Sequence, residues 1–516
     1  MLLSIMTMAL AVPLAAQTVS VTAANPNAAA QGTLNLNVTI SGKGFKNGAS
    51  SSFLVSGTTN PGGIVVHSTS FVNSTTLVAN IDVSDTATVS QFDVAINNAD
   101  GRSGKGSDLF SVLAKSNNAA QCSVTPTPWV TVLNTGTTTY SHLGKAASGR
   151  LVTVLNQSVI MAVSGGGTGG VEVFFLDPVT GQVLDGTWSQ PHLNLTTPVP
   201  TFFSVIIADV NGDAIPDIIV GARDYGVAWV YLGQGGASGT ISFSSAILLT
   251  PPQPNSGFGA AIAVGDLNAD GVNEIALGLT PSGNGKSVTA GKVFLFSWNG
   301  STFTNYQIIT DPQNSNSSGF GTDVAIGDIT GDVNADLVVG ASGSGRVWVY
   351  PGSSLANPFF LTNATSGFGS AVAIGNLAGG TGPNLGLLAI TSLTTAKGYI
   401  FGGPVTSTSV PSLLQPAELD WPQSALDLAD VNGDGLADIL IGSESTGCRG
   451  SAYLYKSSPS GYQAQIFIGA PSGVNLVGYG SSASLVPGTG IVLVGDKYAT
   501  VNGVQNAGQV YVYKLN

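Results

Sequence analysis

The sequence predicts an all-β protein, in which a small β-sandwich precedes a seven-bladed β-propeller, on three observations. Val, Ile, Thr and Ser dominate its ordered-looking stretches, Gly is abundant with 69 residues, and glutamate is almost absent. This composition suits short strands and tight turns, not helices. Strand-like runs in the first 115 residues alternate in polarity between Gly, Asn and Ser turns, as in sandwiches. From residue 125 onward the chain repeats, and repeats of roughly 40 to 60 residues with four strands each are typical of propeller blades.

The first sixteen residues, "MLLSIMTMALAVPLAA", form an apolar run that ends in small residues. This run is too short to span a bilayer, and it predicts a signal peptide over 1–16 and a secreted or cell-surface protein. The usual basic segment is missing because the first lysine is Lys43, so a buried first strand is the alternative. No later stretch of about 18 apolar residues occurs, and we expect no membrane span.

Residues 18–115 are predicted to form the sandwich, and the small and polar residues 116–124 a linker. The strings "ISGKGF", "TTLVANIDV" and "FDVAINNADGRSG" resemble bacterial immunoglobulin-like domains of the IPT/TIG type, which implies an Ig-like fold. The two cysteines, Cys122 and Cys448, are too few for a disulfide framework. Either one bridge or two unpaired thiols is compatible with the sequence.

Residues 125–516 are predicted to form the propeller, because four acidic segments begin at 209, 266, 328 and 430. The last interval, 102 residues, is twice 51 and predicts a degenerate copy between them. Phe368-Gly369 precedes Asn376 by eight residues, as Phe258-Gly259 precedes Asp266. A unit without acids at 149–175 and one at the C-terminus bring the count to seven, and closing strands such as "GRVWVY" end the units.

The succession "SGFG…AVGDLNADGVNEIALG…GKVFLF" resembles the FG-GAP repeat of the integrin α-subunit propeller and its bacterial relatives. The resemblance covers about three quarters of the chain. The Gly-Ala-Pro element departs from the family pattern, since it reads "GAR", "GLTP", "GAS" and "GSE" here, and three blades carry no intact acidic turn. The resemblance implies a binding or adhesion module.

The acidic segments have the chemistry of a calcium site. Calcium takes six to eight oxygen ligands, which side chains at positions 1, 3, 5 and 9 of a turn can supply together with a carbonyl at position 7. The last segment, "DVNGDGLAD", provides three aspartates, an asparagine and the carbonyl of Leu436. Up to four Ca²⁺ are therefore predicted. The candidate ligands are Asp209, Asn211, Asp213 and Asp217; Asp266, Asn268, Asp270 and Glu274; Asp328, Thr330, Asp332 and Asp336; and Asp430, Asn432, Asp434 and Asp438.

Metal-free Asx-turns are the alternative for these segments, since Asp and Asn favour turns in any case. We prefer calcium because a hairpin alone needs no carboxylate at position nine, and clustered carboxylates repel one another without a cation. Twelve of the 28 acidic residues lie in these segments, and without them the net charge of −12 would vanish. The aromatic residues of the "FG" and closing strands are expected in the core, although exposed ones could stack on sugar rings.

Three classes of function fit the sequence. The first is a monomeric recognition or adhesion module for a protein or glycan ligand. The second is an enzyme of the polysaccharide lyase or phospholipase-like type, but the chain has only three scattered histidines and no GxSxG or HExxH motif, so we expect no catalysis and no catalytic residue. The third is a structural part of a surface assembly. Nucleic acid is excluded as a partner because no Lys/Arg cluster exists.

Overall fold

The computed structural model divides the chain into two compact units, Met1–Ser116 and Asn117–Asn516. The predicted signal peptide, the predicted linker, Cys122 and Cys448 lie outside the described residues. The described residues are 18–31, 33, 36–84, 86–113, 131–133, 146–154, 157–165, 171–184, 192–195, 204–235, 241–252, 257–280, 290–363, 367–376, 386–392, 397–414, 423–444, 450–458, 462, 466–469, 478–501 and 506–515.

The first unit is a β-sandwich of two four-stranded sheets. One sheet has the order β1-β3-β6-β5 and the other β2-β8-β7-β4. A single apolar cluster fills the space between them, and it includes Phe53, Phe92 and Phe110, which are fully buried. The predicted sandwich is therefore present, and its immunoglobulin-like identity stays a prediction. The strands are β1 (Ser20–Asn25), β2 (Ala28–Ala30), β3 (Leu36–Lys43), β4 (Ser50–Val55), β5 (Ile64–Asn73), β6 (Thr76–Val83), β7 (Ser90–Asn97) and β8 (Ser103–Leu113).

The second unit contains seven antiparallel four-stranded sheets among its described residues, which we number as blades 1 to 7. Blade 1 consists of β10 (Ala146–Val154), β11 (Gln157–Gly165), β12 (Val171–Leu176) and β13 (His192–Leu195). Blade 2 consists of β14 (Ser204–Ala208), β15 (Asp217–Ala222), β16 (Val227–Tyr231) and β19 (Ile247–Leu249). Blade 3 consists of β20 (Phe258–Gly265), β21 (Glu274–Leu279), β22 (Lys292–Trp298) and β23 (Phe303–Thr310).

Blades 4 to 7 repeat this arrangement. Blade 4 consists of β24 (Phe320–Gly327), β25 (Asp336–Ala341), β26 (Arg346–Tyr350) and β27 (Phe359–Thr362). Blade 5 consists of β28 (Phe368–Asn376), β29 (Gly386–Ser392), β30 (Lys397–Gly402) and β31 (Ser412–Leu413). Blade 6 consists of β32 (Gln423–Ala429), β33 (Asp438–Ser443), β34 (Ser451–Tyr455) and β35 (Ile466–Gly469). Blade 7 consists of β36 (Tyr479–Val486), β37 (Ile491–Asp496), β38 (Gln509–Lys514) and β9 (Thr131–Leu133). A small hairpin, β17 (Gly233–Gly235) and β18 (Ile241–Phe243), extends blade 2.

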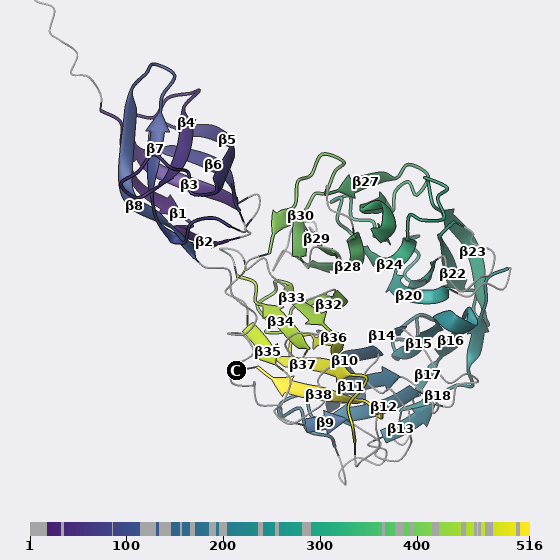
Figure 1. Cartoon of the computed structure of the whole chain (residues 1–516). Helices are drawn as coiled ribbons and strands as arrows, with labels where there is room; N and C mark the ends of the chain where they lie inside the picture. The colour runs from purple at the N-terminus through teal and green to yellow at the C-terminus, as the bar shows by residue number, and fades with distance from the viewer. Residues whose placement is uncertain are drawn as a thin grey trace, which may run out of the picture. The chain divides into compact units, whose positions relative to one another are not determined.

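The blades form a ring with the first strand of each blade innermost (Figure 1). Each of these inner strands contacts the inner strand of the blades before and after it, in the order β10, β14, β20, β24, β28, β32, β36 and back to β10. The described residues of this unit form seven apolar clusters, and each cluster is shared by two successive blades. The predicted all-β propeller fold is therefore confirmed.

Strand β9 closes the ring. It comes from the N-terminal end of this unit, yet it pairs with the C-terminal strand β38 and supplies the fourth strand of blade 7. Leu133 of β9 is buried in the cluster that joins blade 7 to blade 1. The two ends of the repeat region thus meet in one sheet, and β9 covers the edge of β38 so that only a three-residue outer strand is left open.

The Phe-Gly pairs interlock neighbouring blades. Phe258 is fully buried and lies edge-to-face on Phe294 of its own blade, with ring centroids 5.4 Å apart. Gly259 adopts a φ of 77°, and a Cβ on Gly221 of the preceding blade would lie 2.2 Å from the carbonyl oxygen of Gly259. The same approach recurs where Gly278, Gly340 and Gly442 face the Phe-Gly or Tyr-Gly glycine of the next blade. The glycine in the second strand of one blade and the Phe-Gly or Tyr-Gly glycine of the next blade therefore allow the two backbones to touch.

No helix in the described part of the chain is long and apolar enough to cross a membrane.

Candidate functional site

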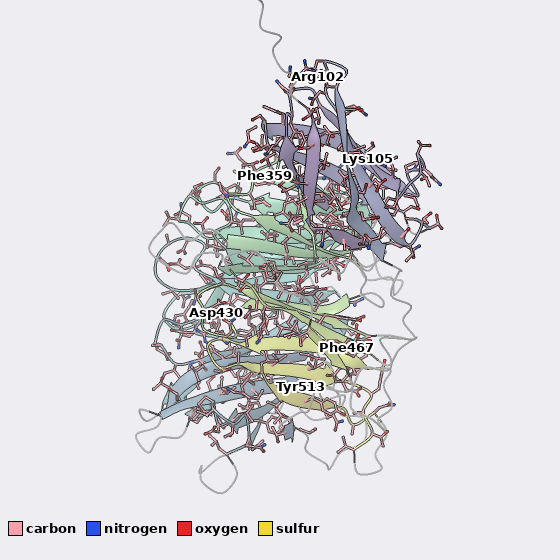
Figure 2. The ribbon with its side chains drawn as sticks, turned by 90° about the vertical axis from the view of Figure 1, so that its left-hand side faces the viewer. Arg102, Lys105, Phe359, Asp430, Phe467 and Tyr513 are labelled. Carbon is pink, nitrogen blue, oxygen red and sulfur yellow. The ribbon has the colours of Figure 1, made fainter. Side chains whose placement is uncertain are left out.

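The four acidic turns join the first and second strands of blades 2, 3, 4 and 6. In each blade, position one follows the inner strand and position nine is the first residue of the second strand, as with Asp430 after β32 and Asp438 at the start of β33. Each blade has four strands that alternate in direction, so the inner strands of all blades run the same way. The four turns that follow these inner strands therefore lie at the same face of the ring. Asp430 marks this face in the edge-on view of the propeller (Figure 2).

The side chains at positions one, three and five hold the turn together. In blade 6, the Asp430 carboxylate accepts hydrogen bonds from the backbone N–H groups of Gly433 and Gly435, at 2.6 and 2.7 Å. The Asn432 side-chain oxygen accepts from the Asp434 N–H, and Asp434 accepts from the Leu436 N–H, both at 2.9 Å. The turn of blade 2 has the same pattern. These bonds fix the backbone of the turn.

Position nine is fully buried in all four turns, at Asp217, Glu274, Asp336 and Asp438. One carboxylate oxygen accepts from the backbone N–H at position two, as Asp438 does from Val431 at 3.0 Å. In three turns the other oxygen accepts from the N–H just beyond the third strand, as Asp438 does from Ser457 at 2.8 Å. The premise that a hairpin has no use for this carboxylate is therefore wrong, because it ties the turn to the third strand.

Blades 3 and 4 vary this arrangement. Glu274 is one methylene longer and accepts from the side-chain Nδ2 of Asn268 at 2.9 Å, in place of a third-strand N–H. In blade 4, Thr330 at position three donates its hydroxyl to Asp336 at 3.2 Å, and Asp336 also accepts from Gly352. Thr330 and Asn268 thus face position nine, whereas Asn432 faces position five.

Burial changes the electrostatics of position nine. It raises the pKa of Asp217 and of Glu274 to about 7, and the carboxylates at positions one and five of the same turns raise these pKa values further, whereas backbone N–H donors oppose the shift. Burial also raises the pKa of Asp336 and Asp438. A cation among the three carboxylates would remove this repulsion.

Position six has a left-handed backbone in all four turns. Gly271 and Gly435 have φ values of 88° and 87°, but Ala214 has 64° and Val333 has 78°. A side chain with a Cβ is strained there, and a β-branched one most of all. The Val333 side chain is 79% exposed, so packing does not offset this strain.

The donor sets fit calcium, with one qualification. Each turn offers carboxylate, amide or hydroxyl oxygens at positions 1, 3, 5 and 9, which are the hard ligands that Ca²⁺ prefers. Within the described residues, however, no three His, Cys, Asp or Glu side chains come together as a ready-made metal site. The carboxylates at positions five and nine would have to turn toward position one to share an ion.

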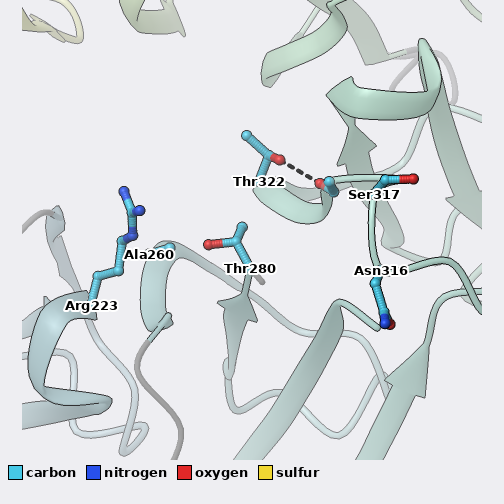
Figure 3. A pocket seen from close by; sticks show the side chains of 7 residues that line it. Arg223, Ala260, Thr280, Asn316, Ser317 and Thr322 are labelled. Atoms are coloured by element: carbon cyan, nitrogen blue, oxygen red, sulfur yellow. Dashed lines mark hydrogen bonds between the residues drawn. The ribbon is translucent and has the colours of Figure 1, made fainter. Parts of the chain in front are cut away.

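A polar pocket of about 430 Å³ lies at the opposite face (Figure 3). Arg223 and Thr280 come from the connections after the second strands of blades 2 and 3, and Asn316 and Ser317 from the connection between blades 3 and 4. Thr322 donates its hydroxyl to the carbonyl oxygen of Gly319 at the edge of the pocket. Sequence reasoning missed these residues because they form no local motif and meet only in the ring.

Comparisons with known proteins match only part of this chain. Residues 209–277, which include the turns of blades 2 and 3, match the model of the FG-GAP-like repeat. Integrin alpha-8 of Homo sapiens is 34% identical over 167 residues, which is 29% of this chain and 15% of the integrin. Integrin alpha-IIb of Mus musculus is 33% identical over 186 residues, or 33% of this chain and 18% of the integrin. Integrin alpha-PS5 of Drosophila melanogaster is 31% identical over 162 residues, or 29% and 15%. The chain thus spans less than a fifth of the length of these relatives.

Proposed function

We propose that this protein is a secreted or cell-surface, calcium-binding propeller that acts as a recognition or adhesion module for a protein or glycan. The similarity to integrin α chains supports adhesion. The apolar run at residues 1–16 supports export. A non-enzymatic role is part of the proposal, because the sequence has neither a nucleophile motif nor a zinc motif. We expect a monomer, since the ring closes on itself through β9.

The grouping of carboxylates at positions one, five and nine carries the calcium part of the proposal, because a cation would remove the repulsion among them. In blades 2 and 3 the carboxylates at positions one and five both raise the pKa of the fully buried acid at position nine, and in blade 6 the carboxylate at position five does so. Asp430, Asn432, Asp434 and Asp438 would hold the ion in blade 6, and the equivalent residues would do so in blades 2, 3 and 4. The ion would supply positive charge that holds the first strand of a blade to the second, so its role is structural.

Thermal unfolding of the full-length protein tests this proposal. We expect a melting temperature several degrees higher in about 1 mM calcium than in excess chelator, because an ion that binds only the folded state stabilises it. Asp434→Ala should reduce the shift, whereas Asp224→Ala, at an exposed aspartate outside the turns, should leave it unchanged. Equal melting temperatures with and without calcium would show that the turns are only Asx-turns.

Binding and turnover on the same ligands test the recognition part. We expect saturable binding of the purified protein to a member of a protein or glycan array, with no product released from polysaccharides in the same buffer. Product formation would favour the enzyme alternative. The absence of saturable binding to every array member would favour a purely structural role.

A further inference from the structure

The polar pocket at the face opposite the acidic turns is built by three successive blades. It has a volume of about 430 Å³ and takes its walls from blade 2, from blade 3 and from the connection into blade 4. Figure 3 shows Arg223 on one side, Asn316 and Ser317 on the other, and Thr280 between them. Every residue that lines the pocket is half-buried or exposed, and none is buried. A ligand from solvent can therefore reach each wall.

The contacts between blades determine which residues meet in this pocket. At the junction of blades 2 and 3, the backbones of Gly221 and Gly259 touch, as described above. Arg223 lies two residues after the first of these glycines, and Ala260 directly follows the second. The residues at the same places beside the next junction are Thr280 and Thr322. Two successive junctions thus fix the base of the pocket.

Backbone hydrogen bonds hold Arg223 and Thr280 in a constant relation. The N–H of Gly257 donates to the carbonyl oxygen of Arg223 at 2.7 Å, and the N–H of Thr280 donates to the carbonyl oxygen of Gly257 at 3.2 Å. The Thr280 hydroxyl is turned toward Arg223 (Figure 3). The positive charge and the nearest hydroxyl are therefore positioned together before any ligand binds.

Arg223 makes the pocket electropositive. It is the one charged side chain among the described residues that line the pocket, and the neighbouring Asp224 is exposed and outside the wall. The same position after the second strand carries Glu444 in blade 6 and Lys497 in blade 7, which form an ion pair at 2.7 Å. A guanidinium has five N–H donors, so Arg223 can bind a ligand in addition to its contacts within the protein. The charge of the pocket favours an anionic group, above all a carboxylate.

The rest of the wall distinguishes between kinds of carboxylate. It presents the hydroxyls of Thr280, Thr322 and Ser317 and the amide of Asn316, which both donate and accept hydrogen bonds. An aspartate or glutamate side chain would bring apolar methylenes to this wall, whereas an acidic sugar brings hydroxyls on the ring that carries its carboxylate. The volume also lies within the roughly 300 to 1,000 Å³ of small-ligand pockets.

We propose that this pocket binds a uronate residue of an acidic glycan. The Arg223 guanidinium pairs with the carboxylate of the sugar, and Thr280 and the wall at 316–317 bind its ring hydroxyls. The inference rests on the proposed recognition function and narrows its ligand to a carboxylated glycan.

Calorimetry with the full-length protein tests the charge requirement. The probes are short oligomers of galacturonate, glucuronate and mannuronate, each compared with its methyl ester, which keeps the sugar ring and removes the charge. We expect the free acid of one of them to bind at least about tenfold more tightly than its ester, since the ion pair with Arg223 is lost in the ester.

Substitutions at Arg223 test the site itself. Arg223→Gln should weaken binding of the free acid about tenfold, and Arg223→Lys about threefold, because lysine keeps the charge but not the planar fork of donors. Arg346→Gln is the matched control. Arg346 begins the third strand of blade 4 at the same face, and its guanidinium carbon lies 4.3 Å from the centre of the Phe360 ring, outside the pocket wall. It removes the same charge from the protein and should change the affinity less than twofold.

Ala260→Thr tests the pocket without changing any charge. Blade 4 carries Thr322 at the equivalent place, so the fold accepts threonine there, and the melting temperature should stay within a few degrees of the wild type. The larger side chain would occupy part of the pocket beside Arg223 and should weaken uronate binding several-fold. This variant keeps the inference testable even if Arg223→Gln fails to fold.

The outcomes separate this inference from the broader proposal. Binding of a free acid that weakens in the ester, in Arg223→Gln and in Ala260→Thr, but not in Arg346→Gln, supports the site. Equal binding of acid and ester, or uronate binding that neither pocket variant changes, overturns the site while recognition stands. Binding of acidic peptides alone, even if Arg223→Gln abolishes it, overturns the glycan assignment. If no uronate oligomer binds but a member of the protein or glycan array does, only this inference fails; if nothing binds, both proposals fail.

Discussion

At the scale of single residues, Val333 is the clearest point of strain. Its φ of 78° in the turn of blade 4 costs about 1 to 2 kcal/mol for a residue with a Cβ. Val333→Gly should therefore raise the free energy of unfolding by about 1 kcal/mol, after the greater flexibility of glycine in the unfolded chain is counted. Denaturant unfolding checks this, and Val333→Ala should gain much less. A loss of stability in Val333→Gly would show that the exposed valine contributes contacts instead of strain.

Asp496 in blade 7 is a buried acid whose environment makes the stability of the protein depend on pH. It is fully buried, its Oδ2 has no hydrogen-bond partner within the described residues, and burial raises its pKa to about 7. The folded protein then holds a proton that the unfolded chain has lost above about pH 4. Stability from this group is complete at low pH and disappears as the pH rises toward about 7.

Asp496→Asn should remove this pH dependence. Relative to the wild type, the variant should gain about 3 kcal/mol in its free energy of unfolding between about pH 5 and about pH 8. Only this difference is diagnostic, since Asp217, Glu274 and Asp323 also have raised pKa values that both proteins share. Parallel pH profiles would show that Asp496 ionises in the folded protein near its ordinary pKa.

At the scale of elements, the contact between blades depends on glycines. Gly278 has no positive φ, but a Cβ there would lie 2.4 Å from the carbonyl oxygen of Gly321. Gly278→Ala should cost about 2 to 3 kcal/mol of stability because neither backbone can move without shifting its blade. Gly235→Ala is the control, since its Cβ would meet only the end of the Ile215 side chain, at 3.4 Å. Urea unfolding distinguishes them, and equal losses would contradict the interlock.

At this scale, the strands and turns of a blade were predictable where a short local sequence pattern marks them. The acidic turns and Phe-Gly pairs recur at a fixed offset, so the blades that carry both could be placed from sequence alone. The degenerate blade 5 followed from the spacing, and its inner strand β28 begins at Phe368. The role of Asp438 could not be predicted, because its partner Ser457 lies beyond the third strand, and a carboxylate at position nine looks the same whether it accepts N–H groups or binds a metal.

At the scale of the whole molecule, ring closure escaped prediction for a related reason. Strand β9 has only three residues, which is too short for a periodic pattern, and its partner β38 is at the opposite end of the chain. The polar pocket also exists only after neighbouring blades come together. The sequence therefore predicts the strands and turns within a blade. The pairing of β9 with β38 and the polar pocket between blades depend on the assembled ring.

Closure through β9 makes a testable prediction about cooperativity. Leu133 is 1% exposed in the cluster between blades 7 and 1, so Leu133→Asp should destabilise the ring by more than about 3 kcal/mol. Thr131→Asp, at a half-buried position of the same strand, should cost less than about 1 kcal/mol. Because every blade packs on two neighbours, loss of β9 should lower the melting temperature of the whole second unit in one transition. Calorimetry would contradict closure by β9 if Leu133→Asp left the main transition unchanged, since the strand would then be a peripheral addition to a ring held by its other blade contacts.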